Sequence, residues 1–182
     1  MEKYMENIIL IGFMGAGKTA VGNYLSKKLG FSYIDTDQYI EEKEGMTISD
    51  IFAKKGEEYF RSLESSVIKE LMQRCETTIY STGGGMPLRE ENARLLKELG
   101  MVVYLKAEAD TIYYRVKGDK KRPLLQCENP KKRIEDLLKE RNPKYEAAGN
   151  YVVQVDGKDI QTVAQEVINL LTETASIKRS LL

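Results

Sequence analysis

The chain reads Gly12-Phe13-Met14-Gly15-Ala16-Gly17-Lys18-Thr19, the pattern G-x-x-x-x-G-K-[ST], directly after the apolar run Ile8-Ile9-Leu10-Ile11. A buried strand, then a glycine-rich loop, then Lys-Thr is the order typical of a phosphate-binding P-loop. The glycines let backbone N–H groups turn inward onto phosphate oxygens, which a Cβ would obstruct. The stretch therefore predicts a site for a nucleoside triphosphate. A glycine-rich turn that binds nothing is the alternative.

Each part of the stretch has an expected role. Lys18 is placed to reach the β- and γ-phosphates, and the Thr19 hydroxyl to ligate Mg²⁺. The helix that follows points the positive end of its dipole at the anion. The residues predicted to contact the nucleotide here are Gly12, Gly15, Ala16, Gly17, Lys18, Thr19 and Ala20.

Length and charge limit the class of protein. The 182 residues suffice for one domain, and Lys+Arg and Asp+Glu both total 28, so no net positive field favours nucleic acid or an anionic membrane. No apolar run approaches the ~20 residues of a membrane span. The two cysteines, Cys75 and Cys127, are too few for a disulfide framework, which favours a cytoplasmic protein. Because the chain has no histidine, acid–base chemistry falls to carboxylates.

Short runs rich in Ile, Val or Tyr alternate with helical patterns. Strands are predicted at about 7–12, 32–36, 77–82, 101–106 and 151–155. Apolar residues spaced by three and four predict helices over 63–72 and 160–171. The alternation predicts a five-stranded parallel sheet in a three-layer α/β/α fold with right-handed crossovers. Ligands of such sheets bind at the carboxyl ends of the strands, so the residues just after each strand are candidates.

Asp35-Thr36-Asp37 follows the second predicted strand. Two carboxylates two residues apart, beside a P-loop, are placed to serve Mg²⁺ and the acceptor of a phosphoryl group. In the alternative, Asp37 caps a helix over 38–44 and Asp35 merely ends the strand. The neighbouring P-loop favours the functional interpretation.

Gly83-Gly84-Gly85 follows the third predicted strand. Three consecutive glycines are entropically costly, which favours close backbone approach to a ligand, with amides offered to it, over a tight turn. The segment before this strand, residues 37–76, holds extra helices predicted over 47–55 and 57–74. We expect these helices to form a wall over the carboxyl edge of the sheet.

Arginines occupy three further places of interest. Arg61 opens a predicted helix against its dipole, so an anion or Glu64 is expected to compensate it; a solvated surface arginine is the alternative. Residues 115–130 are cationic without apolar periodicity, which is typical of a solvated turn or of a lid over phosphates. Pro123 holds Arg122 extended, so that it can project as a finger. Arg141 is predicted at the end of a helix, where it complements the dipole or binds a ligand.

Together these motifs resemble the shikimate kinase family. G-F-M-G-A-G-K-T, D-T-D, F-R-x-x-E, G-G-G, R-P-L-L and L-x-x-R-x-x-x-Y occur in the family's order and spacing over about residues 7–172. The resemblance implies a P-loop NTPase-like fold of the nucleoside monophosphate kinase type. It also implies ATP- and Mg²⁺-dependent phosphorylation of the 3-hydroxyl of shikimate, in chorismate and aromatic amino-acid biosynthesis.

The resemblance further implies a domain organisation. A single kinase domain over 1–182 would have a core at about 7–172, a substrate-binding helical insertion at about 37–76 and a lid at about 116–130. The tail, 174–182, lies beyond the resemblance and is expected to be frayed.

On the acceptor side, the resemblance assigns roles residue by residue. Arg61 and Arg141 would clamp the shikimate carboxylate, a task suited to the planar fork of guanidinium. Asp37 would bind the acceptor hydroxyls and act as general base. The amides of Gly83, Gly84 and Gly85 would contact a ring hydroxyl.

On the nucleotide side, Lys18 and Arg122 would act in catalysis, with Arg122 neutralising charge on the transferring phosphoryl group as the lid closes. Thr19 would ligate Mg²⁺ and Asp35 would approach it through water. Arg115 would lie over adenine, and the loop over 156–158 would border the base.

Other functions stay open. A gluconate kinase shares the P-loop, although its substrate segment tends to use histidine. A nucleoside monophosphate kinase would need a base-specific pocket and more lid arginines. A non-enzymatic nucleotide switch would bind ATP only to signal a partner. Our expectation is ATP and shikimate as partners, without nucleic acid or membrane, and a monomeric protein.

Overall fold

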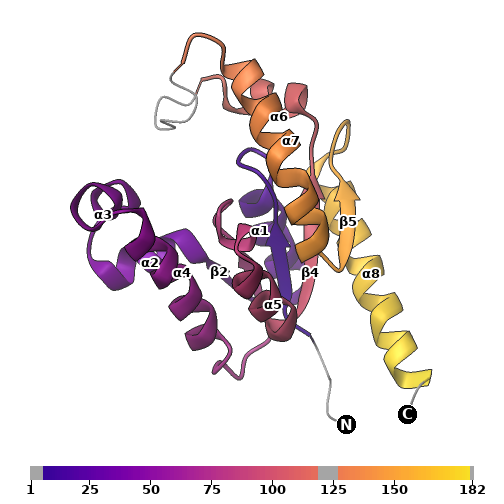
Figure 1. Cartoon of the computed structure of the whole chain (residues 1–182). Helices are drawn as coiled ribbons and strands as arrows, with labels where there is room; N and C mark the ends of the chain where they lie inside the picture. The colour runs from indigo at the N-terminus through magenta and orange to yellow at the C-terminus, as the bar shows by residue number, and fades with distance from the viewer. Residues whose placement is uncertain (1–5, 119–126, 181–182) are drawn as a thin grey trace.

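Five short strands form one parallel sheet in the order β2-β3-β1-β4-β5 (Figure 1). Their bounds are β1 Ile8–Ile11, β2 Ser32–Asp35, β3 Thr78–Ser81, β4 Met101–Lys106 and β5 Tyr151–Gln154. The computed structural model describes residues 6–118 and 127–180, with side chains to residue 174. The predicted five-stranded parallel sheet is confirmed, and each predicted strand matches an observed one to within two residues at either end.

The central strand shows why the sequence predicts this fold. β1 pairs with both β3 and β4, and all four of its residues are fully buried. A parallel strand covered on both faces reads as a continuous apolar run, as Ile8–Ile11 does.

Helices surround the sheet in two groups. α1 packs on α8 and against β1, β2 and β3, whereas α5 packs on α7 and both contact β4. With the sheet, these groups make the predicted three layers. The helices, including the short 3₁₀ helix η1, are α1 Lys18–Leu29, α2 Thr36–Glu44, α3 Ile48–Lys55, α4 Glu57–Leu71, η1 Met86–Leu88, α5 Glu90–Leu99, α6 Ala109–Val116, α7 Pro130–Ala148 and α8 Ile160–Ser180.

The extra helices between β2 and β3 are confirmed. Figure 1 shows α2, α3 and α4 grouped to one side of the molecule, beside the edge strand β2. Within the described residues, no helix is both long enough and apolar enough to cross a bilayer.

Three helix boundaries differ from the sequence prediction. α2 begins at Thr36 and is capped by Asp35, so the alternative in which Asp37 caps this helix is wrong. α7 continues past Pro143 to Ala148, so Arg141 lies inside this helix and not at its end. α8 extends to Ser180, whereas a frayed tail was expected over 174–182.

A buried asparagine joins the glycine run to the extra helices. Asn92 of α5 is fully buried; its amide donates to Met86 O at 3.0 Å, and its oxygen accepts from the Ser65 hydroxyl at 2.6 Å. Met86 opens η1, directly after Gly85, and Ser65 lies on α4. Asn92 therefore fixes the distance between the loop after β3 and the helix that carries Arg61.

We predict that Asn92→Ala lowers the free energy of unfolding by about 2–4 kcal/mol, because it removes two buried hydrogen bonds, leaves the Ser65 hydroxyl with only the longer bond to Arg61 O at 3.3 Å, and opens a cavity. Urea denaturation measures this change. Asn169→Ala, at an exposed position of α8, is the matched control, with an expected change of about 0.5 kcal/mol or less. Equal effects of the two substitutions would contradict the assignment.

Candidate active site

The loop between β1 and α1 has the backbone of an anion-binding loop. Gly12, Gly15 and Gly17 have φ values of 143°, 76° and 98°, which L side chains rarely adopt. A Cβ at Gly12 would lie 2.6 Å from Leu105 O, so packing as well as conformation demands glycine there. α1 has no side-chain cap, and the N–H groups of its first turn face the loop that precedes it.

Lys18 folds back over this loop. Its Nζ donates to Gly12 O at 2.8 Å and to Phe13 O at 3.1 Å, which holds the ammonium above the glycine-rich turn. The arrangement concentrates a lysine charge, a helix N-terminus and converging amides at one point. Such a point suits a polyphosphate.

Asp35 joins the P-loop to strand β2. One carboxylate oxygen caps α2 by accepting from the Asp37 and Gln38 N–H groups, and the other lies 3.4 Å from the Thr19 hydroxyl. Within the ranges that the structure describes, no cluster of three Cys, Asp or Glu side chains could hold a metal alone. One hydroxyl and one carboxylate nevertheless fit Mg²⁺, which commonly takes few protein ligands and completes its shell with phosphate and water.

Asp37 is the most unusual acid of the site. Its Oδ1 is buried and has no hydrogen-bond partner among the described residues. Burial and the neighbouring Asp35 raise the pKa of Asp37 to about 6, against the opposing effect of Lys18 and Arg61. A hydroxyl of another molecule can donate the hydrogen bond that Asp37 Oδ1 lacks.

The glycine run makes room for charged side chains. A Cβ at Gly83 would collide with the Asp37 carboxylate, and a Cβ at Gly85 with the Arg61 guanidinium. The Gly83 N–H donates to the Thr36 hydroxyl at 3.1 Å, so the expectation of an amide offered to a ligand is wrong for Gly83. Gly83 instead has no Cβ, which lets the Asp37 carboxylate approach its Cα closely. Gly84 O accepts from the Tyr145 hydroxyl at 2.7 Å.

Arg61 is held by two acids of its own helix, α4. Nη1 donates to Glu64 at 2.8 Å, while Nε and Nη2 donate to one oxygen of Glu57 at 3.3 and 3.2 Å. The expected compensation by Glu64 is therefore confirmed. Burial raises the pKa of Glu64 to about 7 although Arg61 acts against it, and Glu64 Oε1 is buried with no partner in the described part of the chain.

Arg141 reaches the same region from α7. Its guanidinium lies over the Phe13 ring, 5.6 Å from the ring centre, and its buried Nε has no partner within the described segments. Burial raises the pKa of Tyr145 to about 12, while the positive charges of Arg141 and Arg61 both act to lower it. Arg61 lies against Gly85, and Tyr145, one helical turn after Arg141, binds the carbonyl of Gly84, so both arginines lie near the glycine run.

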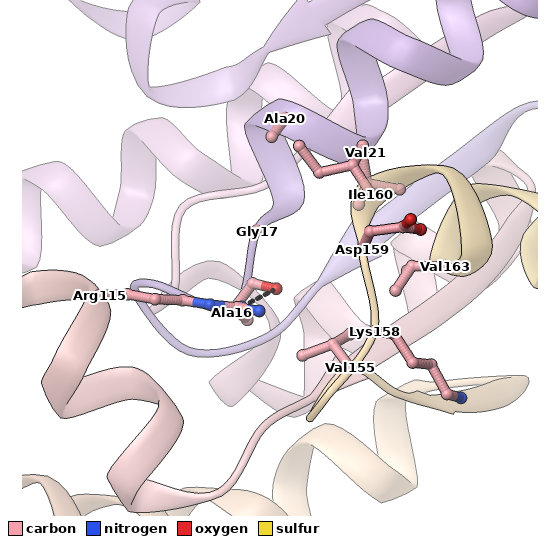
Figure 2. A pocket seen from close by; sticks show the side chains of 10 residues that line it. All are labelled: Ala16, Gly17, Ala20, Val21, Arg115, Val155, Lys158, Asp159, Ile160 and Val163. Atoms are coloured by element: carbon pink, nitrogen blue, oxygen red, sulfur yellow. Dashed lines mark hydrogen bonds between the residues drawn. The ribbon is translucent and has the colours of Figure 1, made fainter.

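A separate cavity of about 230 Å³ lies beside the P-loop (Figure 2). Arg115 of α6 borders it and donates to Gly15 O at 3.1 Å and to Ala16 O at 3.3 Å. Ala16, Gly17, Ala20, Val21, Arg115, Val155, Lys158, Asp159, Ile160 and Val163 line the cavity. A largely apolar pocket at the mouth of a P-loop suits a nucleotide base.

The loop before α8 borders this cavity only in part as predicted. Lys158 lines it, but Asp156 is not among the lining residues and accepts from the Glu108 N–H at 3.0 Å. Arg122 and most of the predicted lid lie outside the described residues. α6 ends at Val116 and α7 begins at Pro130, so the two helices flank the stretch expected to form the lid.

The sequence analysis gave no role to three residues that contact the glycine run or Arg141: Thr36, Phe13 and Tyr145. Tyr145 carried a usable signal, because it follows Arg141 by four residues and so shares its helix face. Thr36 and Phe13 carried none, since their roles depend on contacts with Gly83 and Arg141, which are distant in the sequence.

The fold and the site define the class: a P-loop kinase with a phosphate loop on one side and an acid–arginine cluster on the other. The family model for shikimate kinase matches residues 14–172. The chain belongs to the shikimate kinase family.

Relatives and solved structures agree with this membership. The chain is 46% identical over 164 residues to the shikimate kinase of Thermodesulfovibrio yellowstonii, covering 90% of this chain and 94% of that protein. The structure of shikimate kinase from Acinetobacter baumannii in complex with shikimate matches with a TM-score of 0.87 and 40% identity, covering 94% of this chain and 96% of the other. A gluconokinase from Sinorhizobium meliloti, at 16% identity and a TM-score of 0.63 over 99% of each chain, shares the fold alone.

Gly83 and Gly84 differ in the space that surrounds them, so we expect alanine to have different effects at the two positions. Gly83→Ala places a Cβ against Asp37 and should lower the free energy of unfolding by about 1–3 kcal/mol. Gly84→Ala is the matched control, because its Cβ would lie 3.6 Å or more from its neighbours, and we expect a change below about 1 kcal/mol. Urea denaturation compares them. Equal losses would contradict the steric account.

Asp37→Asn should stabilise the fold at pH 8. Because the pKa of Asp37 rises from 3.8 to about 6 in the folded chain, its favourable contribution exists at low pH and is lost as the pH rises through about 6. Ionised Asp37 thus costs up to about 3 kcal/mol, and we expect the substitution to recover about 1–3 kcal/mol at pH 8 and little at pH 4. Thermal unfolding at both pH values measures this. A variant less stable than the parent at pH 8 would refute it.

Proposed function

We propose that the protein transfers the γ-phosphoryl group of ATP to the 3-hydroxyl of shikimate, giving shikimate 3-phosphate and ADP on the route to chorismate and aromatic amino acids. The observation that carries this is the Asp37 carboxylate, whose buried Oδ1 has no partner among the described residues and whose pKa is raised to about 6 by burial although the charges of Lys18 and Arg61 act to lower it. Family membership and the relative described in complex with shikimate support the same acceptor.

The acceptor side offers groups that complement shikimate. Two guanidinium groups that approach one point repel each other unless an anion lies between them, and the shikimate carboxylate is such an anion. Arg61 and Arg141 would bind it. Asp37 would accept a hydrogen bond from the 3-hydroxyl and hold or take its proton as the oxygen attacks phosphorus. Gly83, Gly84 and Gly85 would line the hydroxylated ring of shikimate.

The nucleotide side offers the matching phosphate site. The P-loop amides, Lys18 and the first turn of α1 would bind the β- and γ-phosphates. Thr19 and Asp35 would hold Mg²⁺, which, when bound, neutralises charge on the phosphates. Ala16, Gly17, Ala20 and Arg115 would border the base in the cavity of Figure 2. Arg122 would add a charge from the lid.

The proposal extends to the rest of the chain. One kinase domain would span the sequence, with the insertion over 37–76 carrying Arg61 and the lid over 116–130 carrying Arg122. The protein would act as a monomer in the cytoplasm and would bind neither nucleic acid nor membrane. Gluconate and nucleoside monophosphates are the acceptors to exclude.

The test measures ADP release with ATP and Mg²⁺, with and without shikimate, and with gluconate and AMP as controls. We expect release that depends on shikimate, with little release in either control. Release with gluconate or AMP in place of shikimate would overturn the assigned acceptor. Slow release that no acceptor accelerates would favour a nucleotide switch.

The pKa of Asp37 predicts a pH profile. If the ionised carboxylate receives the hydroxyl hydrogen, kcat/KM for shikimate falls as the pH drops through about 6, and at pH 5 it should be about tenfold below its plateau. Initial rates between pH 5 and 8.5 measure the profile, and thermal unfolding at each pH confirms that the protein stays folded. A rate that stays constant down to pH 5 would remove Asp37 from this role.

A further inference from the structure

The guanidinium group of Arg61 binds two carboxylates, each through different nitrogen atoms. Nη1 pairs with Glu64, and the opposite edge, formed by Nε and Nη2, pairs with a single oxygen of Glu57. The Nε–Nη2 edge is one of the two edges at which guanidinium takes a carboxylate through two parallel bonds. Glu57 therefore sits where a carboxylate of another molecule can bind.

The two acids differ in their freedom to leave Arg61. The Glu64 side chain is 1% exposed, and Arg61 Nη1, which pairs with it, lies against Gly85. The protein therefore encloses this pair. The Glu57 side chain is 67% exposed, in the first turn of α4, and its pair with Arg61 spans one helical turn. An exposed pair of this kind contributes little stability, and water readily solvates the released carboxylate.

The Nη1 side is thus fixed, and the Nε–Nη2 edge is the one that can exchange partners. We propose that Glu57 holds the edge of Arg61 that the acceptor carboxylate takes, so that acceptor binding exchanges one carboxylate for another. This inference rests on the proposed function, which places the shikimate carboxylate on Arg61. It adds that a residue of α4 competes with the substrate and weakens its binding.

The exchange has a consequence for selectivity. An anion that engages Arg61 through one bond does not replace both bonds that Glu57 makes, whereas a carboxylate in the two-bond geometry does. Glu57 therefore lowers the affinity for every anion but lowers it more for those that bind Arg61 through a single contact.

Three variants separate contact from charge. Glu57→Gln removes the competing charge, and Glu57→Asp keeps the charge but shortens the side chain, so that it no longer spans to both nitrogens. Glu58→Gln removes the same charge one residue along α4, where Glu58 pairs with Arg89 at 2.6 Å and not with Arg61. Steady-state kinetics give kcat and KM for shikimate and for ATP in each protein.

We expect KM for shikimate to fall about two- to fivefold in both Glu57 variants, with kcat and KM for ATP unchanged, because only an exposed ion pair is lost. In Glu58→Gln, KM for shikimate should stay within about 1.5-fold of the parent value. A raised KM in the Glu57 variants would overturn the proposal, because Glu57 would then position Arg61. An equal fall in Glu57→Gln and Glu58→Gln, without one in Glu57→Asp, would also overturn it.

Shikimate-dependent ADP release by the parent protein is measured first. Its absence would overturn the proposed function together with this inference. Normal turnover by the parent with an unaltered KM in both Glu57 variants would overturn this inference alone.

Discussion

The acid–arginine cluster depends on one close packing: the Asp37 carboxylate against the bare Cα of Gly83. Thr36 fixes this contact from one side, since its hydroxyl accepts from the Gly83 N–H. Asp35 fixes it from the other, since its carboxylate caps α2 and orients the first turn that carries Asp37. The three residues of one short motif thus connect the P-loop, the extra helices and the loop after β3.

The cluster is built from groups that the fold leaves unsatisfied. Asp37 Oδ1, Glu64 Oε1 and Arg141 Nε are all buried without partners in the part of the chain that the structure describes. Buried polar atoms without hydrogen bonds cost stability, so a site that keeps three of them is arranged for something other than folding. A molecule carrying a carboxylate and several hydroxyls can complement the guanidinium and the carboxylates at once. We infer that this unsatisfied capacity is what recognises the acceptor.

Much of the architecture follows from local sequence. The run Ile8–Ile11, the glycine pattern after it and the alternation of strands with helices predicted the sheet and the phosphate loop, because each depends on residues close in the chain. Long-range contacts were out of reach. α7 passes through Pro143, which normally costs a helix about 3 kcal/mol, because Tyr145 beyond it packs on Tyr104 and binds Gly84. The contacts of Asp35 with Thr19 and of Asp37 with Gly83 were likewise out of reach, because each joins residues that lie far apart in the sequence.

The central claim is that the fold buries Asp37 Oδ1 without a hydrogen bond from the described residues, within the acid–arginine cluster. Carboxyl-carbon NMR of protein labelled at aspartate tests it directly, with the Asp37 resonance assigned by its loss in an Asp37→Asn spectrum. The account predicts a titration midpoint near pH 6, from the raised pKa of Asp37. A midpoint close to 4, the ordinary range of a solvated aspartate, would contradict it.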